Sequence, residues 1–219
     1  MNYETNKILG GIGAILMFIG IFPMANSYGV LELIGAVLIL VALYGLSGHF
    51  HEAGIFKNAL IGVLAGIVGV VLAFVILIAV VLANIGSFLY QIYPGWDGSW
   101  ASLSGMTADT SQFAAGNFDL STLVPIITGA LAVLVILWIF AIVGTFFIRR
   151  SLKQVSTKSG VGLFGTAGTL LLAGAFLTII VLGLVLMWIA ALLLAIAFFQ
   201  LKQAEPIPPS YPPPPQAPV

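Results

Sequence analysis

Long apolar segments separated by short polar ones run along most of the chain. A crossing of the hydrocarbon core of a bilayer needs about 20 apolar residues as a helix. Segments suited to such helices cover residues 8–25, 30–46, 59–89 and 123–148. A further apolar stretch, residues 161–201, is too long for one crossing, and we divide it at a turn around residues 180–183. The pattern predicts an all-α fold, a polytopic membrane bundle of six transmembrane helices. The third segment exceeds one crossing, so it should tilt or project beyond the membrane on one side.

Composition supports an integral membrane protein. Hydrophobic residues make up 61% of the 219 residues and charged residues 6%, against about 25% charged in soluble domains. Basic and acidic residues number seven each, so net charge predicts no nucleic-acid partner, and membrane lipid is the expected surrounding. The chain has no cysteine, which excludes disulfides and thiolate metal sites.

The basic residues predict the orientation. Positive residues collect in cytoplasmic loops. With six spans, all of them fall before the first helix, in the second and fourth loops, or after the last helix: Lys7, Lys57, Arg149, Arg150, Lys153, Lys158 and Lys202. We therefore expect a multi-pass protein of the cell membrane with both termini in the cytoplasm.

One large outside loop is expected at about residues 90–121. It is rich in Gly, Ser and Thr and begins with an aromatic cluster that includes Trp96 and Trp100. Such residues are typical of the aromatic belt at the headgroup level. The alternative is a binding platform or a re-entrant cap over a central cavity.

The chain divides into a helix bundle, residues 1–204, and a Pro-rich cytoplasmic tail, residues 205–219. Proline at this density favours an extended, disordered segment. Within it, Pro208-Pro209-Ser210-Tyr211 matches the PPxY pattern read by WW domains,. The tail is therefore either simply solvated or the contact for a protein partner.

The first and last hairpins predict an internal repeat. After a shift of 154 residues, Leu9 falls on Leu163, Gly11 on Gly165, and Gly20 on Gly174. The first and last helix pairs would then be parallel copies of one hairpin, and the whole chain three in–out–in hairpins.

Small residues predict where helices approach closely, because helices in lipid associate through tight packing. The candidate packing positions are Gly11, Gly62, Gly66 and Gly165. They serve packing within the chain, contacts in a homo-oligomer, or a glycine-lined path. On the packing interpretation, Gly66→Leu should disrupt the bundle.

Few residues offer chemistry. Glu32 is the one ionisable residue in the predicted spans. It either reaches the surface near a helix start, where negative charge is favourable, or forms a cation or proton site. His49, His51 and Glu52 carry metal-ligating groups, but their loop spacing favours a solvated loop,. No catalytic motif is recognisable, so we expect a non-enzymatic protein without catalytic, cofactor or metal residues.

The apolar segment at residues 9–20 raises the question of a cleaved signal peptide. It lacks a suitable small-x-small cleavage site, and its pattern returns in the last hairpin, where a signal has no role. We therefore expect it to be retained.

Three stretches resemble a known family. They are Lys7-Ile-Leu-Gly-Gly-Ile-Gly, Ala42-Leu-Tyr-Gly-Leu-Ser and Gly54-Ile-Phe-Lys-Asn-Ala-Leu, and the last hairpin before the tail is similar too. Over residues 3–203 the chain resembles the largely archaeal multi-pass membrane proteins of domain of unknown function 996. The resemblance implies an archaeal membrane protein and no established activity.

Two functional hypotheses follow. The first is a non-enzymatic membrane protein that acts by interaction, through the tail or the bundle. The second is a channel or transporter for a small neutral or weakly charged solute. A cavity that Glu32 faces would be the most informative structural observation.

Overall fold

The computed structural model describes residues 2–20, 29–109, 111, 120–180 and 182–202, and within these residues the regular structure is helical. The α-helices are α1 (Tyr3–Gly20), α2 (Val30–His49), α3 (Ala53–Ile92), α5 (Val124–Ser159), α6 (Leu163–Leu177) and α7 (Leu182–Phe199). Short 3₁₀ turns are η1 (Ser102–Gly105), η2 (Leu120–Leu123) and η3 (Thr178–Ile180). Five helical segments of the described residues are long and apolar enough to cross a membrane: α2, α3, α5 with the end of η2, α6 together with η3, and α7. The all-α prediction is confirmed.

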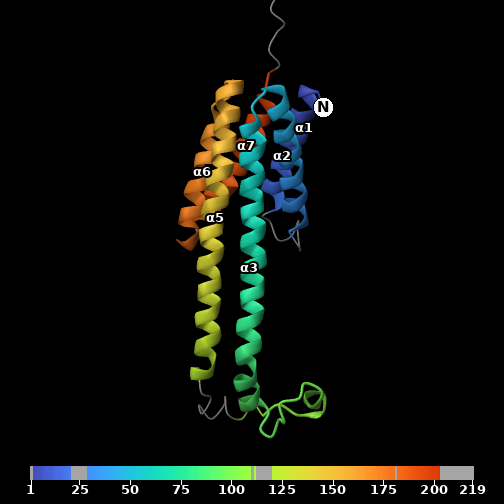
Figure 1. Ribbon diagram of the computed structural model, residues 1–219, viewed down its shortest axis with the longest axis vertical. Coiled ribbons are helices and arrows are strands. Elements are labelled where there is room, and N and C mark those ends of the chain that lie inside the picture. Colours follow the sequence, from blue (N-terminus) through green and yellow to red (C-terminus); the bar gives the residue numbers. More distant parts are fainter. Residues whose placement is uncertain (1, 21–28, 110, 112–119, 181, 203–219) are drawn as a thin grey trace, which may run out of the picture.

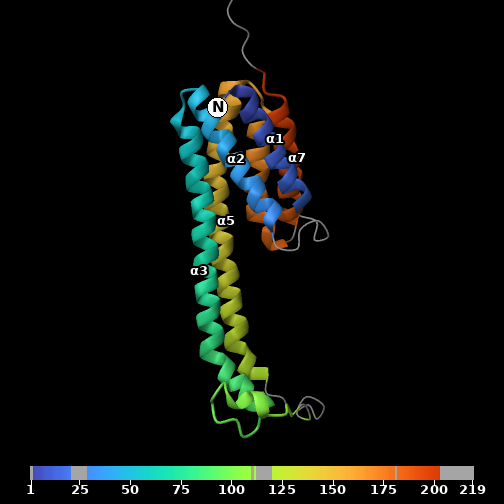
Figure 2. The ribbon, with the colours of Figure 1, turned by 90° about the vertical axis from the view of Figure 1, so that its right-hand side faces the viewer.

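The helices form a closed ring (Figures 1 and 2). In order around the ring, α1 packs on α2, α2 on α3, α3 on α5, α5 on α6, α6 on α7, and α7 on α1. The contact between α2 and α3 is the least extensive of these six. The ring therefore has a centre that all six helices can reach, and a thin wall between α2 and α3.

The hairpin of α3 and α5 is much longer than the other two. With a rise of about 1.5 Å per residue, α3 is about 60 Å long and α7 about 27 Å,. Figure 1 shows α3 and α5 continuing far beyond the ends of the other helices. We call this projecting part the arm. It begins near Trp138, whose Nε1 donates a hydrogen bond of 3.0 Å to the Ala175 carbonyl near the end of α6. The sequence predicted that the third helix projects, and in the structure α3 does project beyond the ends of α1, α2, α6 and α7.

The packed core lies at the end of the ring where α1 begins and α7 ends, here called the termini end. Phe164, Phe198, Leu46 and Leu152 are fully buried there. The Ser151 hydroxyl donates a 2.6 Å hydrogen bond to the Ile55 carbonyl, which ties α5 to the start of α3. Elsewhere large apolar side chains face outward, as expected for helices surrounded by lipid.

The last apolar stretch is divided into two helices close to the predicted turn, but the break lies slightly earlier, and Gly183 is already part of α7. α6 ends at Leu177, η3 follows, and α7 begins at Leu182. The predicted bounds of the fourth helix are wrong, because α5 continues to Ser159. Arg149, Arg150, Lys153 and Lys158 therefore lie on a helix and not in a loop. No residue before Gly160 breaks the helix, whereas Gly160 ends it with a left-handed φ of 73°,.

The described residues place all seven basic side chains at the termini end. The repeat of the first and last hairpins stays a prediction. The end of the first predicted span, residues 21–25, and the tail lie outside the described residues.

Candidate functional site

The centre of the ring holds a cavity of about 360 Å³. Side chains from all six α-helices line it: Ala14, Met17, Glu32, Ala36, Ile39, Leu40, Leu43, Ala59, Val63, Thr145, Ile148, Leu171, Leu184, Met187, Ala191 and Leu194. Apart from Glu32 and Thr145 these side chains are apolar. The volume lies within the range of about 300–1,000 Å³ that is usual for small-molecule sites. The lining chemistry suits an apolar molecule.

Glu32 is the ionisable residue of this lining, in the first turn of α2. Its carboxyl group packs against Gly20, the last described residue of α1. A Cβ placed on Gly20 would lie 2.7 Å from the Glu32 Cδ, so a larger residue there would displace the carboxyl group. Glu32, which the sequence analysis identified as the ionisable residue of the predicted spans, thus lines the central cavity.

Thr145 is the second polar group of the lining. Its hydroxyl lies 2.7 Å from the Ala141 carbonyl, to which it donates within α5. A hydroxyl bound in this way keeps its acceptor lone pairs. Among the described lining residues, the side chains therefore offer acceptors and no free donor.

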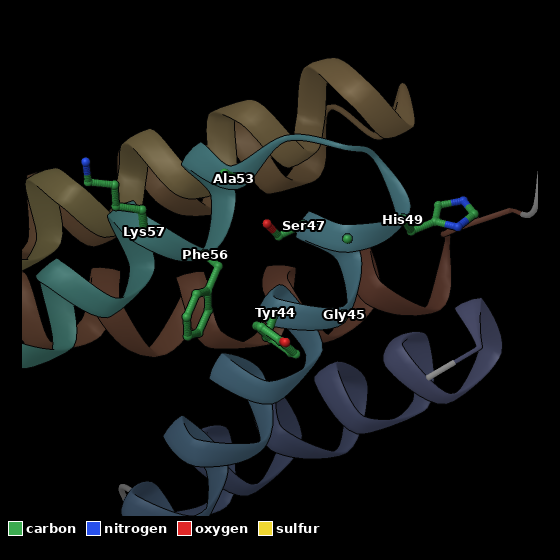
Figure 3. Close-up of a pocket in the computed structure, with 8 residues that line it drawn as sticks. Tyr44, Gly45, Ser47, His49, Ala53, Phe56 and Lys57 are labelled. Atoms are coloured by element: carbon green, nitrogen blue, oxygen red, sulfur yellow. The ribbon is translucent and has the colours of Figure 1, made fainter.

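A second, open hollow of about 670 Å³ lies between α2 and α3 at the termini end (Figure 3). The rings of Tyr44 and Phe56 meet edge to face across it, with centroids 5.0 Å apart. Ser47, His49 and Lys57 contribute polar groups to its rim. Leu43 and Ala59 of the same two helices line the central cavity, so the aromatic pair stands on the outer side of the thin α2–α3 wall. An aromatic pair beside a lysine suits the interface of apolar chains and headgroups.

The predicted packing glycines divide into two groups. A Cβ at Gly11 would lie 2.5 Å from the ring of Phe199, and one at Gly62 would lie 2.7 Å from the Gly144 carbonyl oxygen. At Gly165 the nearest atom is 3.4 Å away, an ordinary contact with Ser156. At Gly66 a Cβ meets nothing within 4 Å. Gly11 and Gly62 therefore lie at close approaches, whereas the expectation that Gly66→Leu disrupts the bundle is wrong because that side of α3 is open.

The two tryptophans of the loop at the far end of the arm, Trp96 and Trp100, differ in burial. Trp96 is 6% exposed, and its Nε1 donates a 2.7 Å hydrogen bond to the Ser99 carbonyl. Its ring contacts Tyr90 and Trp100. Trp100 is 60% exposed. Trp96 thus organises the loop, and Trp100 is the tryptophan that presents a surface.

The remaining candidates do not converge on a site. His49 packs on the ring of Tyr3, and Glu52 pairs with Lys158 at 3.5 Å. No three metal-ligating side chains gather in the part of the chain that the structure describes. Pro208, Pro209 and Tyr211 lie outside it.

Sequence reasoning missed most of the cavity lining and the Tyr44–Phe56 pair. Apolar residues of a membrane helix look alike whether they face lipid, a neighbour or a cavity. The one available signal was Glu32, because a carboxylate in an apolar span calls for a polar environment or a ligand.

Comparison with known proteins identifies a family and supplies no activity. No solved structure matches the chain. The chain is 29% identical over 204 residues to the uncharacterized protein MJ1644 of the archaeon Methanocaldococcus jannaschii, covering 92% of this chain and 94% of the relative. A model of the family described as "Protein of unknown function (DUF996)" matches residues 31–192. The match spans more than half of the chain, so the chain belongs to this family of proteins of unknown function.

Proposed function

We propose that the protein is a non-enzymatic protein of the cell membrane that binds a lipid-soluble small molecule in the cavity of its helix ring. The observation that supports this proposal most strongly is the cavity of about 360 Å³, which residues from all six α-helices line. A bundle built only for support has no need of such a space, because unfilled volume in a helix bundle costs stability.

The lining supports an apolar ligand. Met17 and Met187 face the cavity from α1 and α7, and methionine side chains adapt well to ligands of irregular shape. The thin α2–α3 wall supports entry from the bilayer, since a ligand dissolved in lipid reaches this wall without crossing water. The Tyr44–Phe56 pair stands beside that route.

A photolabelling experiment tests the proposal. The full chain in lipid nanodiscs is exposed to a neutral alkyl probe that carries a diazirine, and the labelled peptides are mapped by mass spectrometry. Ala191→Trp fills the cavity, because Ala191 lines it and is 7% exposed. Ala132→Trp is the matched control, because Ala132 lies on the exposed surface of α5.

The proposal expects labels on cavity-lining peptides, lost in Ala191→Trp and kept in Ala132→Trp. Labels confined to outward-facing side chains, or cavity labels that survive Ala191→Trp, would show that the cavity does not bind the probe.

A transporter for a small neutral or weakly charged solute is the second candidate. The central position of the cavity favours it, because alternating access places the substrate site at the midplane between repeats. The buried core at the termini end, which includes Phe164 and Phe198, blocks a straight path, so transport would require the hairpins to move. Solute uptake by liposomes that contain the protein, absent from Ala191→Trp liposomes, would support this candidate over simple binding.

A further inference from the structure

We infer that the hollow between the end of α5 and the start of α3 binds the headgroup of an anionic phospholipid, whose hydrocarbon chains lie along the outer face of α5. This inference concerns a second site and does not depend on a ligand in the central cavity. Three features carry it: the charge of the hollow, the lack of acidic partners for two of its cations, and the apolar row that continues from it along α5.

The hollow has a volume of about 420 Å³ and lies at the termini end, where α5 ends and α3 begins (Figure 1). Its lining consists of Glu52, Arg150, Lys153, Gln154, Thr157 and Lys158. Three of these side chains are positive and one is a carboxylate, so the lining carries an excess of two positive charges. A concave surface with charge of one sign concentrates ions of the opposite sign. The hollow therefore suits an anion.

Two of the three cations lack an acidic partner among the described residues. Lys158 pairs with Glu52 at 3.5 Å, whereas Arg150 and Lys153 form no ion pair with a described residue. The other described carboxylate of the termini end, Glu4, pairs with a lysine of its own helix. Like charges one turn apart on a helix repel each other, so an anion bound between Arg150 and Lys153 is stabilising. Guanidinium and ammonium groups are well suited to bind phosphate.

The same face of α5 is apolar on the side of the hollow toward the arm. Residues spaced alternately by three and four positions lie on one face of a helix, and such a row consists of Ile139, Val143, Phe146, Arg150 and Lys153. All five are exposed. The guanidinium carbon of Arg150 lies 6.0 Å from the centroid of the Phe146 ring. The charged half of the row thus begins directly where its apolar half ends.

This arrangement favours a lipid over a free phosphate ion. A phosphate ion would contact the basic half of the row and make no use of the apolar half. A phospholipid matches both halves, because its chains cover Val143 and Phe146 while its phosphate meets Arg150. Basic pockets between transmembrane helices are known to bind anionic headgroups in this way.

The general preference of basic residues for the cytoplasmic side explains the sign of this charge but not its position. Four of the seven basic residues lie within the last three turns of α5. Lys57, by contrast, lines the hollow beside Tyr44 and Phe56, and no second Lys or Arg is among the described residues of that lining. Lys57 and the exposed Lys202 therefore provide a control for charge at the same end of the protein.

The test compares two phospholipid probes with the same diazirine-bearing chain. Phosphatidylglycerol has an uncompensated phosphate charge, and phosphatidylcholine carries its own ammonium group. Each probe is present at a low fraction in phosphatidylcholine nanodiscs that contain the full chain. After photolysis, mass spectrometry measures the label on the α5 peptide that contains Val143 and Phe146. This yield is divided by the yield on the arm peptide around the exposed Leu131, which reports general contact with lipid.

We expect the phosphatidylglycerol probe to give the higher normalised yield on the Val143–Phe146 peptide. The double variant Arg150→Gln/Lys153→Gln should lower this yield by about tenfold, since each basic residue near a membrane surface contributes to the attraction. The control Lys57→Gln/Lys202→Gln removes the same charge and should leave the yield unchanged. Equal yields of the two probes in the natural protein, or equal losses in the two double variants, overturn the inference.

Two further measurements complete the test. Inorganic phosphate should displace the phosphatidylglycerol probe no more than chloride does at the same ionic strength. Selective displacement by phosphate would assign the hollow to the free ion and overturn the lipid site. If Arg150→Gln/Lys153→Gln does not fold, the natural protein is labelled at increasing chloride concentration. Screening should then lower the phosphatidylglycerol yield and leave the phosphatidylcholine yield unchanged, and a phosphatidylglycerol yield that salt does not alter overturns the inference.

Discussion

Gly62 of α3 and Gly144 of α5 bring the backbones of the two arm helices into contact. A Cβ on Gly62 would lie 2.7 Å from the Gly144 carbonyl oxygen, and one on Gly144 would lie 2.9 Å from the Gly62 carbonyl oxygen. The contact is reciprocal, so neither glycine can be enlarged without separating the helices. Close approach of this kind lets van der Waals packing contribute to helix association in lipid.

Gly62→Leu should therefore destabilise the bundle. Overpacking of a tight contact typically costs about 1–3 kcal/mol, and the backbone oxygen at this site cannot rotate away. Thermal unfolding in detergent, followed by tryptophan fluorescence, should show a lower midpoint. Gly66→Leu is the matched control one turn further along α3, where a Cβ meets nothing within 4 Å. Equal effects of the two variants would contradict the packing assigned to Gly62.

Substitution of Asn6, in contrast to that of Gly62, should stabilise the bundle. Asn6 is fully buried in α1, and neither its Oδ1 nor its Nδ2 has a hydrogen-bond partner among the described residues. A buried amide without partners costs about 1–3 kcal/mol, and leucine has nearly the same shape. Asn6→Leu should raise the unfolding midpoint measured in the same assay.

Asn58 provides the control for Asn6→Leu. Its Nδ2 donates to the Gly54 carbonyl at 2.8 Å and to the Gln154 Oε1 at 3.3 Å. Asn58→Leu removes these bonds and should lower the midpoint. A lower midpoint for Asn6→Leu as well would mean that the Asn6 amide is satisfied, for example by a buried water molecule.

The sequence was a good guide to the helices and a poor guide to their ends. Apolar length predicted six helices, and the predicted turn around residues 180–183 lies close to the break between α6 and α7, although Gly183 itself belongs to α7. Hydropathy placed the end of the fourth helix at Ile148, yet α5 continues through Arg149 to Ser159. Apolar length reports where the membrane stops, whereas a helix stops where the backbone is broken, here at Gly160.

Of the residues that line the central cavity, only Glu32 could be identified from the sequence as a candidate. Glu32 was identifiable because a carboxylate is rare in an apolar span. Its neighbours in the cavity were not, because the position of Met17 or Ala191 depends on the rotation of each helix about its axis. A membrane helix is apolar on the side that faces lipid and on the side that faces its neighbours, so a single sequence says little about which side faces the cavity. The same degeneracy made Gly66 look equivalent to Gly62.

Acid should loosen the loop at the end of the arm. The pKa of the Asp97 carboxyl lies below its ordinary value of 3.8, first because the Ser102 hydroxyl bonds to it and second because the Ser99 N–H does. These bonds measure 2.6 and 2.8 Å. Because the folded pKa is the lower one, Asp97 stabilises the loop above the ordinary pKa, and this contribution is lost as pH falls through the folded pKa.

Ser102→Ala should raise the pKa of Asp97 toward 3.8. The change can be followed by the carboxyl carbon shift of Asp97 in NMR titrations. Ser104→Ala is a suitable control, because the Ser104 hydroxyl donates to the Ala101 carbonyl and not to Asp97. A pKa that stays the same in Ser102→Ala would show that the hydroxyl does not bind the carboxylate in solution.

The collection of all seven basic side chains at the termini end predicts that this end faces the cytoplasm,. The chain has no cysteine, so single cysteines can report the orientation without background. Thr157→Cys lies on the exposed surface near the end of α5, and Ser104→Cys lies on the exposed loop of the arm. In intact cells a membrane-impermeant maleimide should label Ser104→Cys and spare Thr157→Cys, and permeabilised cells should label both. Labelling of Thr157→Cys in intact cells would reverse the orientation. In that case the packed end of the ring would face the outside, and the arm would extend toward the cytoplasm.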